Sequence, residues 1–332
     1  MPKASVIIVS YNGLSIPHPN LADCLKALAS QSFTDYETII VDNGSTDKSV
    51  EYISTQYPQM KTLKLTRNYG FAPANNIGFA ASTGEYIVLL NNDAVPLEGW
   101  LAELVQQAEM NPSFKILASI QLPDQYPRKT RNLYVYGTPR LHDPEVTSAI
   151  LPSLFASGAA LLVRRSWIDK LGYLFDNSFI TTAEDLELSI RTILSGGEIG
   201  YVVSSRVIHY AGTTRKFYRT EYAYLATRNE LISYFRVLSL PSFVKILVVR
   251  FVYIASRIVG RSREIRRNLG MLAGLIAGIL YIPLNLQKRR DFQRIKSVSD
   301  RFLFMNLKFK SSSTLGRLLW IFLNWPRESG RS

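Results

Sequence analysis

The chain has 332 residues, of which 47% are hydrophobic, and it carries a net charge of +13 and one cysteine, Cys24. This length suffices for one large domain with an appendage or for two domains, and the apolar content excludes a disordered or fibrous protein. A single cysteine excludes a disulfide framework and a cysteine-based metal site. With no secretory pattern after Met1, it favours a reducing, cytoplasmic location.

The charge is unevenly distributed along the chain. Residues 1–214 hold 16 Lys and Arg against 20 Asp and Glu, whereas residues 215–332 hold 23 against 6. An ordinary globular front joined to a cationic, apolar back favours an anionic surface as partner, either lipid or nucleic acid.

The first part of the chain alternates strands and helices. Ala4–Ser10 is a run of small and β-branched residues typical of a buried parallel strand, and Tyr36–Val41 repeats this pattern. Between them, Asn20 followed by Asp23 predicts the start of a helix that continues to Gln31. Strand, helix and strand with short joins imply a right-handed crossover in a parallel sheet.

Acidic residues follow two of the predicted strands. Asp42 comes directly after the second strand, and Asp93 comes shortly after the apolar strand Tyr86–Leu90. The carboxyl ends of parallel strands line the ligand crevice of an open α/β sheet, so we expect both acids to face one crevice. There Asp42 could accept the N–H of a pyrimidine base. Asp93 is a candidate metal ligand, because Mg²⁺ needs only one or two protein carboxylates when substrate phosphates supply the rest. Ordinary turn chemistry is the alternative at both positions.

Two loops near these acids carry further polar side chains. Ser45 or Thr46 is expected to cap a helix over Asp47–Gln56. The loop after the third strand holds two glycines and three asparagines, and Asn75 and Asn76 offer donors and acceptors to a sugar or diphosphate. A helix start with packing glycines is the alternative there.

A second acidic pair is expected at the start of a helix. Glu184 and Asp185 fall in its first turn, and Glu187 lies one turn before Arg191 as an ion pair. A helix dipole favours acids in the first turn, and Thr182 with Asp185 fits a capping box. A structural role therefore competes with a catalytic one.

The order of these motifs resembles glycosyltransferase family 2, whose members have a GT-A domain. The resemblance covers roughly residues 4–230 and is specific because four motifs follow in order at strand ends. They are Ser-Tyr-Asn at 10–12, Val-Asp-Asn-Gly-Ser-Thr-Asp at 41–47, Arg-Asn-Tyr-Gly-Phe at 67–71 with Asn76-x-Gly78, and Leu-Asn-Asn-Asp at 90–93. It implies an α/β fold with a Rossmann-like mixed sheet flanked by helices.

The resemblance also implies an inverting sugar transfer from a nucleotide-diphosphate sugar, dTDP-rhamnose or a UDP-sugar, in the rhamnosyltransferase-like branch. Tyr11 would stack near the base, Asp42 would bind the base, and Asp93 would hold Mg²⁺ or Mn²⁺ on the diphosphate. Asp185 would act as general base, with Glu184 able to substitute, and take the acceptor hydroxyl's proton as its oxygen attacks the anomeric carbon. The other implied nucleotide-sugar contacts are Arg67, Asn75, Asn76, Asn92 and Arg215.

His209 is the third histidine of the chain and precedes a Gly-Thr-Thr-Arg loop. A lone histidine is more often structural than a ligand. The family places a histidine here near metal and phosphate, so His209 is predicted as second metal ligand or phosphate contact. The sequence departs from many relatives at Asn92, where they carry an acid, and at Asn75, where they carry an arginine.

Leu240-Pro241 divides the chain into a predicted transferase domain, 1–238, and a basic, apolar helical region, 239–332, expected to associate with membranes. Phe243–Val259 has the pattern of a helix that lies in a membrane interface. Residues 268–287 are uncharged and long enough to span a bilayer. Basic residues on both flanks favour a re-entrant or interfacial helix over a span.

Three glycines at four-residue spacing, Gly270, Gly274 and Gly278, predict close helix packing in this second region. The stripe would pack either within the protein or between copies in a homo-oligomer. A buried helix that covers the catalytic domain is the alternative to membrane association.

These features predict a peripheral or monotopic enzyme at the cytoplasmic face of the plasma membrane. Its acceptor would be a lipid-linked saccharide or a cell-surface polysaccharide precursor. The rivals are a nucleic-acid-binding protein, a sugar nucleotidyltransferase and a catalytically dead scaffold. Nucleic acid is not expected as a partner, because the basic residues are interleaved with aliphatic runs and belong to no recognised nucleic-acid module. Residues 10–19 lack the glycine-rich, basic loop of a nucleotidyltransferase.

Overall fold

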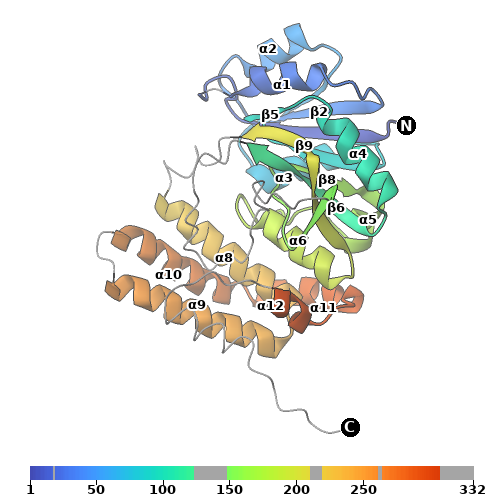
Figure 1. Cartoon of the computed structure of the whole chain (residues 1–332). Coiled ribbons are helices and arrows are strands. Elements are labelled where there is room, and N and C mark those ends of the chain that lie inside the picture. The colour runs from blue at the N-terminus through green and yellow to red at the C-terminus, as the bar shows by residue number, and fades with distance from the viewer. Residues whose placement is uncertain (18, 123–147, 210–218, 261–263, 307–332) are drawn as a thin grey trace.

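The computed structural model describes residues 1–306 except 18, 123–147, 210–218 and 261–263 (Figure 1). Within these residues a mixed sheet flanked by helices forms the first part of the molecule, and a group of long helices lies against one side of it (Figure 1). The predicted α/β class, with a mixed sheet and a C-terminal helical region, is confirmed.

Nine strands of the described chain form one sheet, in the order β3-β2-β1-β4-β8-β6-β9-β5, with β7 beside β9. The strands are β1 (Ala4–Ser10), β2 (Tyr36–Asp42), β3 (Lys61–Lys64), β4 (Tyr86–Leu90), β5 (Ala94–Pro96), β6 (Phe114–Leu122), β7 (Ile150–Ser153), β8 (Ala160–Arg164) and β9 (Glu198–His209). The first four run parallel, as predicted, and β8 runs antiparallel to β4.

The register of the strands brings distant segments to one edge of the sheet. Ser10 pairs with Asp42, so β1 and β2 end at the same level. Because β8 is antiparallel to β4, its first residue, Ala160, pairs with Leu90 at the end of β4. At the end of β9, His209 pairs with Ala94. This edge is called the carboxyl edge below.

Helices cover both faces of the sheet. They are α1 (Leu21–Ala29), α2 (Ser49–Gln56), α3 (Phe71–Ala80), α4 (Trp100–Met110), α5 (Arg165–Leu171), α6 (Glu184–Leu194), α8 (Arg219–Val237), α9 (Leu240–Gly260), α10 (Ile265–Leu280), α11 (Leu286–Ile295) and α12 (Asp300–Asn306). Successive strand residues point to opposite faces. Ile8 therefore packs in the core under α1 and α4, and Ile7 in the core under α3, α5, α6 and α8.

Of the two predicted helix starts near the N-terminus, one is confirmed and the other is wrong. Asn20 and Asp23 form the expected capping box at α1. Helix α2 instead begins at Ser49, without a side-chain cap, so the predicted cap at Ser45 or Thr46 is wrong. The reason is a competing contact, because the Ser45 hydroxyl and the Thr46 N–H both bond to Asn12 in the loop after β1.

The C-terminal helices are built around α8. The glycine stripe of α10 lies against it: a Cβ at Gly274 would come within 2.3 Å of the Tyr224 carbonyl oxygen, and one at Gly270 within 2.6 Å of that of Thr220. The stripe thus packs within the protein, the first of its two predicted roles. Contact between copies through it would require α10 to leave α8.

The tail is continuous with the rest of the molecule. Helix α9 begins at Leu240, where the domain boundary was predicted, but Phe243 of α9, Met271 of α10 and Phe292 of α11 belong to the same hydrophobic core as Ile7 of the sheet. The division at residue 238 stays a prediction. No single described helix is long and apolar enough to cross a bilayer, although α10 together with Pro283–Ile295, bent by 61°, has the length and composition to do so.

Candidate active site

Asp42 ends β2 with its side chain fully buried. One carboxylate oxygen, Oδ2, accepts the N–H of Ser45 at 3.3 Å, whereas Oδ1 has no hydrogen-bond partner among the described residues. A buried acceptor without a hydrogen-bond partner is costly, so Oδ1 has the capacity to accept one further hydrogen bond. Tyr11 follows β1 at the same edge and is 47% exposed.

Asp93 and His209 meet at the carboxyl edge. The Asp93 Oδ1 atom lies 3.3 Å from His209 Nε2, and His209 Nδ1 lies 3.1 Å from Gln121 Oε1. Both ring nitrogens of His209 thus have polar neighbours at this edge, the amide of Gln121 on one side and the Asp93 carboxylate on the other. A carboxylate and an imidazole so close together suit a shared cation.

The neighbouring asparagines hold this edge together. Asn92 donates from Nδ2 to the Ser10 hydroxyl at 3.2 Å and thereby ties β4 to β1. Asn91 places Nδ2 3.5 Å from His209 Nε2, and its Oδ1 is buried without a partner among the described residues. Asn91 was part of a predicted motif but had no predicted role, and Gln121 was not predicted at all. The first begins the Asn-Asn-Asp run, whereas nothing in the sequence marks Gln121.

Three His, Cys, Asp or Glu side chains grouped to hold a metal do not occur among the described residues. Among the described residues, such a metal site would therefore have at most two ligands of these residue types, Asp93 and His209. The donor set nevertheless fits Mg²⁺ or Mn²⁺, because such ions commonly take one or two protein groups and complete their shell with phosphate oxygens and water.

The second acidic pair reaches the same edge through β8. Asp185 accepts the N–H of Gly158 at 3.2 Å, and the carbonyl of the next residue, Ala159, accepts the N–H of Asn91 at 2.8 Å. Two backbone steps thus connect Asp185 with the Asn-Asn-Asp run. The structure therefore brings Asp42, Asp93 and Asp185 to one edge of the sheet.

Glu184 is buried beside Asp185, and its Oε2 atom has no partner in the described part of the chain. Burial, reinforced by the charge of Asp185, raises the pKa of Glu184 to about 8. The predicted capping box at Thr182 is wrong. Helix α6 follows Ala183 without a side-chain cap, and the buried Thr182 hydroxyl has no hydrogen-bond partner among the described residues. Thr182 and Ala183 adopt left-handed φ angles of 71° and 64°, so the backbone before α6 differs from that of a capping box.

The remaining predicted contacts are placed as follows. Arg67 is exposed, with its guanidinium 4.8 Å from the centre of the Tyr69 ring. Asn75 is buried and donates to the Phe71 carbonyl, so its amide is used within α3. Asn76 is bonded to Phe175 through both ends of its amide, which fastens α3 to the loop after α5. Arg215 lies outside the described residues.

Two side chains of α8 hold the segment before α6. Asn229 donates to the carbonyls of Thr181 and Thr182 at 3.0 and 2.9 Å, and Arg228 donates to the Ser178 carbonyl at 2.8 Å. The two residues are adjacent in the sequence, and no local pattern around them predicts these contacts.

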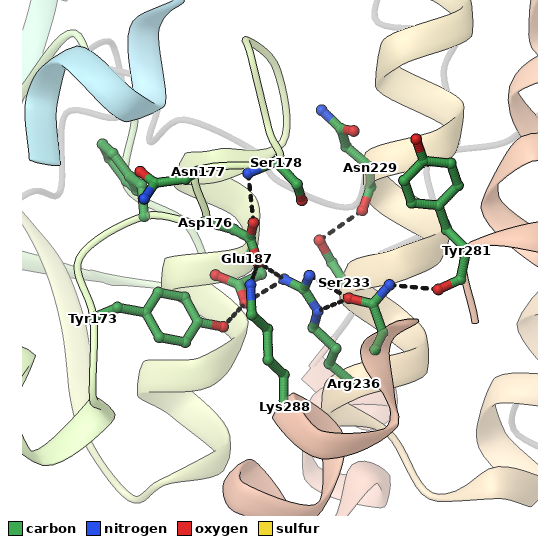
Figure 2. A network of polar contacts seen from close by, with 12 residues as sticks. Tyr173, Asp176, Asn177, Ser178, Glu187, Asn229, Ser233, Arg236, Tyr281 and Lys288 are labelled. Carbon is green, nitrogen blue, oxygen red and sulfur yellow. Dashed lines mark hydrogen bonds and ion pairs between the residues drawn. The ribbon is translucent and has the colours of Figure 1, made fainter. Parts of the chain in front are cut away.

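A buried network of ion pairs also holds the segment before α6 (Figure 2). Asp176 is contacted by Arg236 of α8 at 2.6 Å and by Lys288 of α11 at 2.5 Å, and Glu187 pairs with Arg191 at 2.8 Å as predicted. Although burial acts in the opposite direction, the charge of Arg236 and the hydrogen bond from Lys288 hold the pKa of Asp176 well below its usual range. The network joins the C-terminal helices to the segment that leads into Glu184 and Asp185.

The family model described as "Glycosyl transferase family 2" matches residues 5–172, half of the chain. The chain belongs to glycosyltransferase family 2. The matched region contains Asp42, Asp93 and the start of β8, but not the acidic pair of α6.

Curated relatives of this family 2 glycosyltransferase match it over part of their length. An uncharacterised glycosyltransferase of Haemophilus influenzae is 38% identical over 96 residues, 28% of this chain and 37% of that protein. The O-antigen biosynthesis protein RfbC of Myxococcus xanthus is 26% identical over 235 residues, 65% of this chain and 18% of that protein. The chain thus spans well under half the length of these relatives.

Solved structures share the fold of the family 2 glycosyltransferase at low identity. S. aureus TarS 1–349 superposes with a TM-score of 0.59 at 16% identity and covers 93% of each chain. A TarS complex with UDP-GlcNAc gives 0.58 at 15% identity over 88% of this chain and 90% of that one. GalNAc-T7 with UDP, GalNAc and Mn²⁺ gives 0.58 at 16% identity over 86% of this chain and 56% of that one.

Proposed function

We propose that this family 2 protein is an inverting glycosyltransferase that moves a sugar from a nucleotide-diphosphate sugar to a lipid-linked saccharide or a cell-surface polysaccharide precursor. The observation that carries the proposal is the meeting of three carboxyl groups, Asp42, Asp93 and Asp185, at one edge of the sheet. Each has a separate task in such a transfer, namely base binding, metal binding and proton removal.

The donor binds along the ends of β1, β2 and β4. Asp42 accepts an N–H of the base through its Oδ1 atom, which has no hydrogen-bond partner in the described part of the chain, and Tyr11 stacks near the base. The UDP-GlcNAc complex of TarS supports a UDP-sugar as donor, with dTDP-rhamnose as the other candidate. The O-antigen biosynthesis named for RfbC supports a cell-surface polysaccharide precursor as acceptor.

Asp93 and His209 hold the divalent cation, Mg²⁺ or Mn²⁺, for which the Mn²⁺ in the GalNAc-T7 structure is support. When bound, the cation supplies positive charge to the diphosphate. Asn91 and Asn92 keep this edge in register with β1 and β8.

Asp185 removes the proton from the acceptor hydroxyl. The hydroxyl oxygen attacks the anomeric carbon from the face opposite the diphosphate, and the bond to the diphosphate breaks with its electron pair, which inverts the configuration. Glu184 keeps its own proton at neutral pH because its pKa is raised to about 8, which leaves Asp185 as the carboxyl group suited to accept one.

The proposal is tested by a panel of nucleotide sugars, including UDP-GlcNAc and dTDP-rhamnose, with and without Mn²⁺. One donor should raise the melting temperature and release its nucleoside diphosphate, because specific binding stabilises the folded state. Asp42→Ala should weaken binding of that donor by about tenfold or more, the effect of losing a buried hydrogen bond. Stabilisation by a nucleoside triphosphate with a sugar phosphate instead would favour a nucleotidyltransferase.

The acceptor brings the enzyme to the cytoplasmic face of the plasma membrane, and α9 with α10 forms the surface that docks there. Both helices leave an apolar face uncovered. The exposed side chains, between 45% and 89% on α9 and between 49% and 70% on α10, are Leu240, Val244, Val248, Phe251 and Val259, and Leu269, Ile276 and Leu280. Their spacings of three, four, seven and eight residues put each set on one side of its helix.

Cations flank this surface, which suits an anionic bilayer. Arg266 is exposed at the start of α10, and the exposed Arg290 follows its end. The glycine face of α10 is occupied by α8, so the helix lies in the interface with its opposite side, as amphipathic monotopic helices do.

Vesicle flotation of the full-length protein tests the docking surface. We expect binding to vesicles of phosphatidylcholine with phosphatidylglycerol, less to phosphatidylcholine alone, and a loss of about tenfold in Val248→Asp/Phe251→Asp. Met110→Asp, at a 66% exposed position on α4, is the matched control and should bind as the wild type does. Absence of binding, or a dimer in light scattering that dissociates in the α9 variant, would show that another occupant covers the face.

A further inference from the structure

The turn that precedes α6 is held in an unfavourable conformation. Among the described residues, the non-glycine positions with positive φ are Asn12, Thr182 and Ala183, and the last two are consecutive. Left-handed backbone is costly for residues that carry a Cβ, and it persists only where surrounding contacts fix it. Something outside the turn must therefore hold Thr182 and Ala183 in place.

The amide of Asn229 is that contact. It is fully buried, and its Nδ2 atom donates one hydrogen to the Thr181 carbonyl and the other to the Thr182 carbonyl. Its Oδ1 atom accepts from Arg228 Nε at 2.9 Å, which fixes the orientation of the amide. Both N–H groups of the amide thus donate to two consecutive carbonyls of the strained turn.

This turn sets the direction in which the acidic pair, Glu184 and Asp185, points. Glu184 and Asp185 follow it at once as the first residues of α6, and the helix has no side-chain cap of its own. The Ala183 carbonyl accepts the first helical bond, from Glu187 N–H at 2.9 Å. A change in the turn therefore rotates or displaces the Asp185 carboxylate relative to Gly158 at the carboxyl edge.

We propose that Asn229 is a positioning residue that, oriented by Arg228, holds the turn before α6 and thereby aims Asp185 at the acceptor oxygen. This inference rests on the proposed role of Asp185 as general base. Asn229 itself touches no substrate. Its contribution is to the rate of the chemical step, because a base displaced by about 1 Å loses about 100-fold in rate.

The test compares Asn229→Ala and Asn229→Asp with Ser233→Ala, using release of nucleoside diphosphate from the donor that the nucleotide-sugar panel selects. Ser233 bonds to the Asn229 carbonyl one turn further along α8 and is equally buried, so it is the matched control (Figure 2). We expect kcat to fall about 100-fold in both Asn229 variants, with donor KM within about threefold of wild type. Ser233→Ala should stay within about threefold in both.

The aspartate variant separates hydrogen bonding from packing. Asp has the shape of Asn but an ionised carboxylate donates nothing, so it repels the Thr181 and Thr182 carbonyls and should be at least as impaired as Ala. A kcat close to wild type in Asn229→Asp would overturn the proposal.

Arg228→Ala, which leaves the amide in place but unoriented, should give an intermediate loss and covers the case in which the Asn229 variants do not fold. Asp185→Asn, assayed in parallel, distinguishes the two failures: full activity there overturns the proposed function, and inactivity there with active Asn229 variants overturns only this inference.

Discussion

The two sides of the candidate site are built differently. On the proposed donor side, Asp42 and Asp93 lie at or just beyond the ends of parallel strands whose apolar runs can be seen in the sequence. On the acceptor side, Glu184 and Asp185 follow a strained turn that Asn229 holds from 47 residues further along. The difference teaches that strand ends can place acidic side chains with local information, whereas the placement of Asp185 depends on packing by the C-terminal helices.

The sharpest test of this comparison removes the carboxylate of Asp185, the proposed general base. Asp185→Asn should lower kcat about 1,000-fold, because general base catalysis contributes this order of rate, and should leave donor affinity within a few-fold. Steady-state kinetics with calorimetric donor titration measure both quantities. A large loss of donor affinity instead would mean that the two sides are not separate.

A substitution that disturbs the packing of α10 on α8 tests whether the acidic pair of α6 depends on the C-terminal helices. Gly274→Val should lower the free energy of unfolding by about 2 kcal/mol or more, because the added side chain meets the Tyr224 carbonyl. Ala273→Val, at the adjacent exposed position of α10, is the control and should stay within about 0.5 kcal/mol of wild type. Denaturant unfolding measures both, and kcat should fall in the glycine variant even where donor affinity is kept. Equal stabilities of the two variants would contradict the packing described for the stripe.

The smallest expected effect concerns the buried proton of Glu184. Its pKa of about 8 in the folded protein exceeds the ordinary value of about 4.3. The folded state therefore binds a proton that the unfolded chain releases, and this group's contribution to stability falls as the pH rises from about 4 to about 8. Glu184→Gln removes that loss, so its melting temperature should exceed that of wild type by a few degrees at pH 8 and by less at pH 5. Glu198→Gln, at an exposed position, should show no such trend, and an equal difference at both pH values for Glu184→Gln would refute the assignment.

The donor side could be predicted from the sequence because its signals are local. The apolar runs of β1, β2 and β4 are unambiguous, and polar residues follow each run at once. Parallel pairing then places Asp42 and Asp93 at one edge without further information. The capping box at Asn20 was equally readable, since all its atoms lie within four residues.

The acceptor side could not be predicted in the same way. Thr182 and Asp185 have the spacing of a capping box, yet the turn they occupy is set by Asn229, which the local pattern does not contain. The cap expected at Ser45 failed for the same reason, because Asn12 competes for it across 33 residues. Asn75 was expected at a ligand, but burial in α3 directs its amide to its own helix.

The packing of α10 onto α8 gives synthesis of the protein a fixed order. Residues up to Asp93 can form their parallel strands as soon as they leave the ribosome, since their partners precede them. The turn before α6 has to wait for α8, and α8 gains its neighbour only when Gly278 has been made. The acidic pair of α6 therefore reaches its final position only after helices that follow it in the sequence have been made.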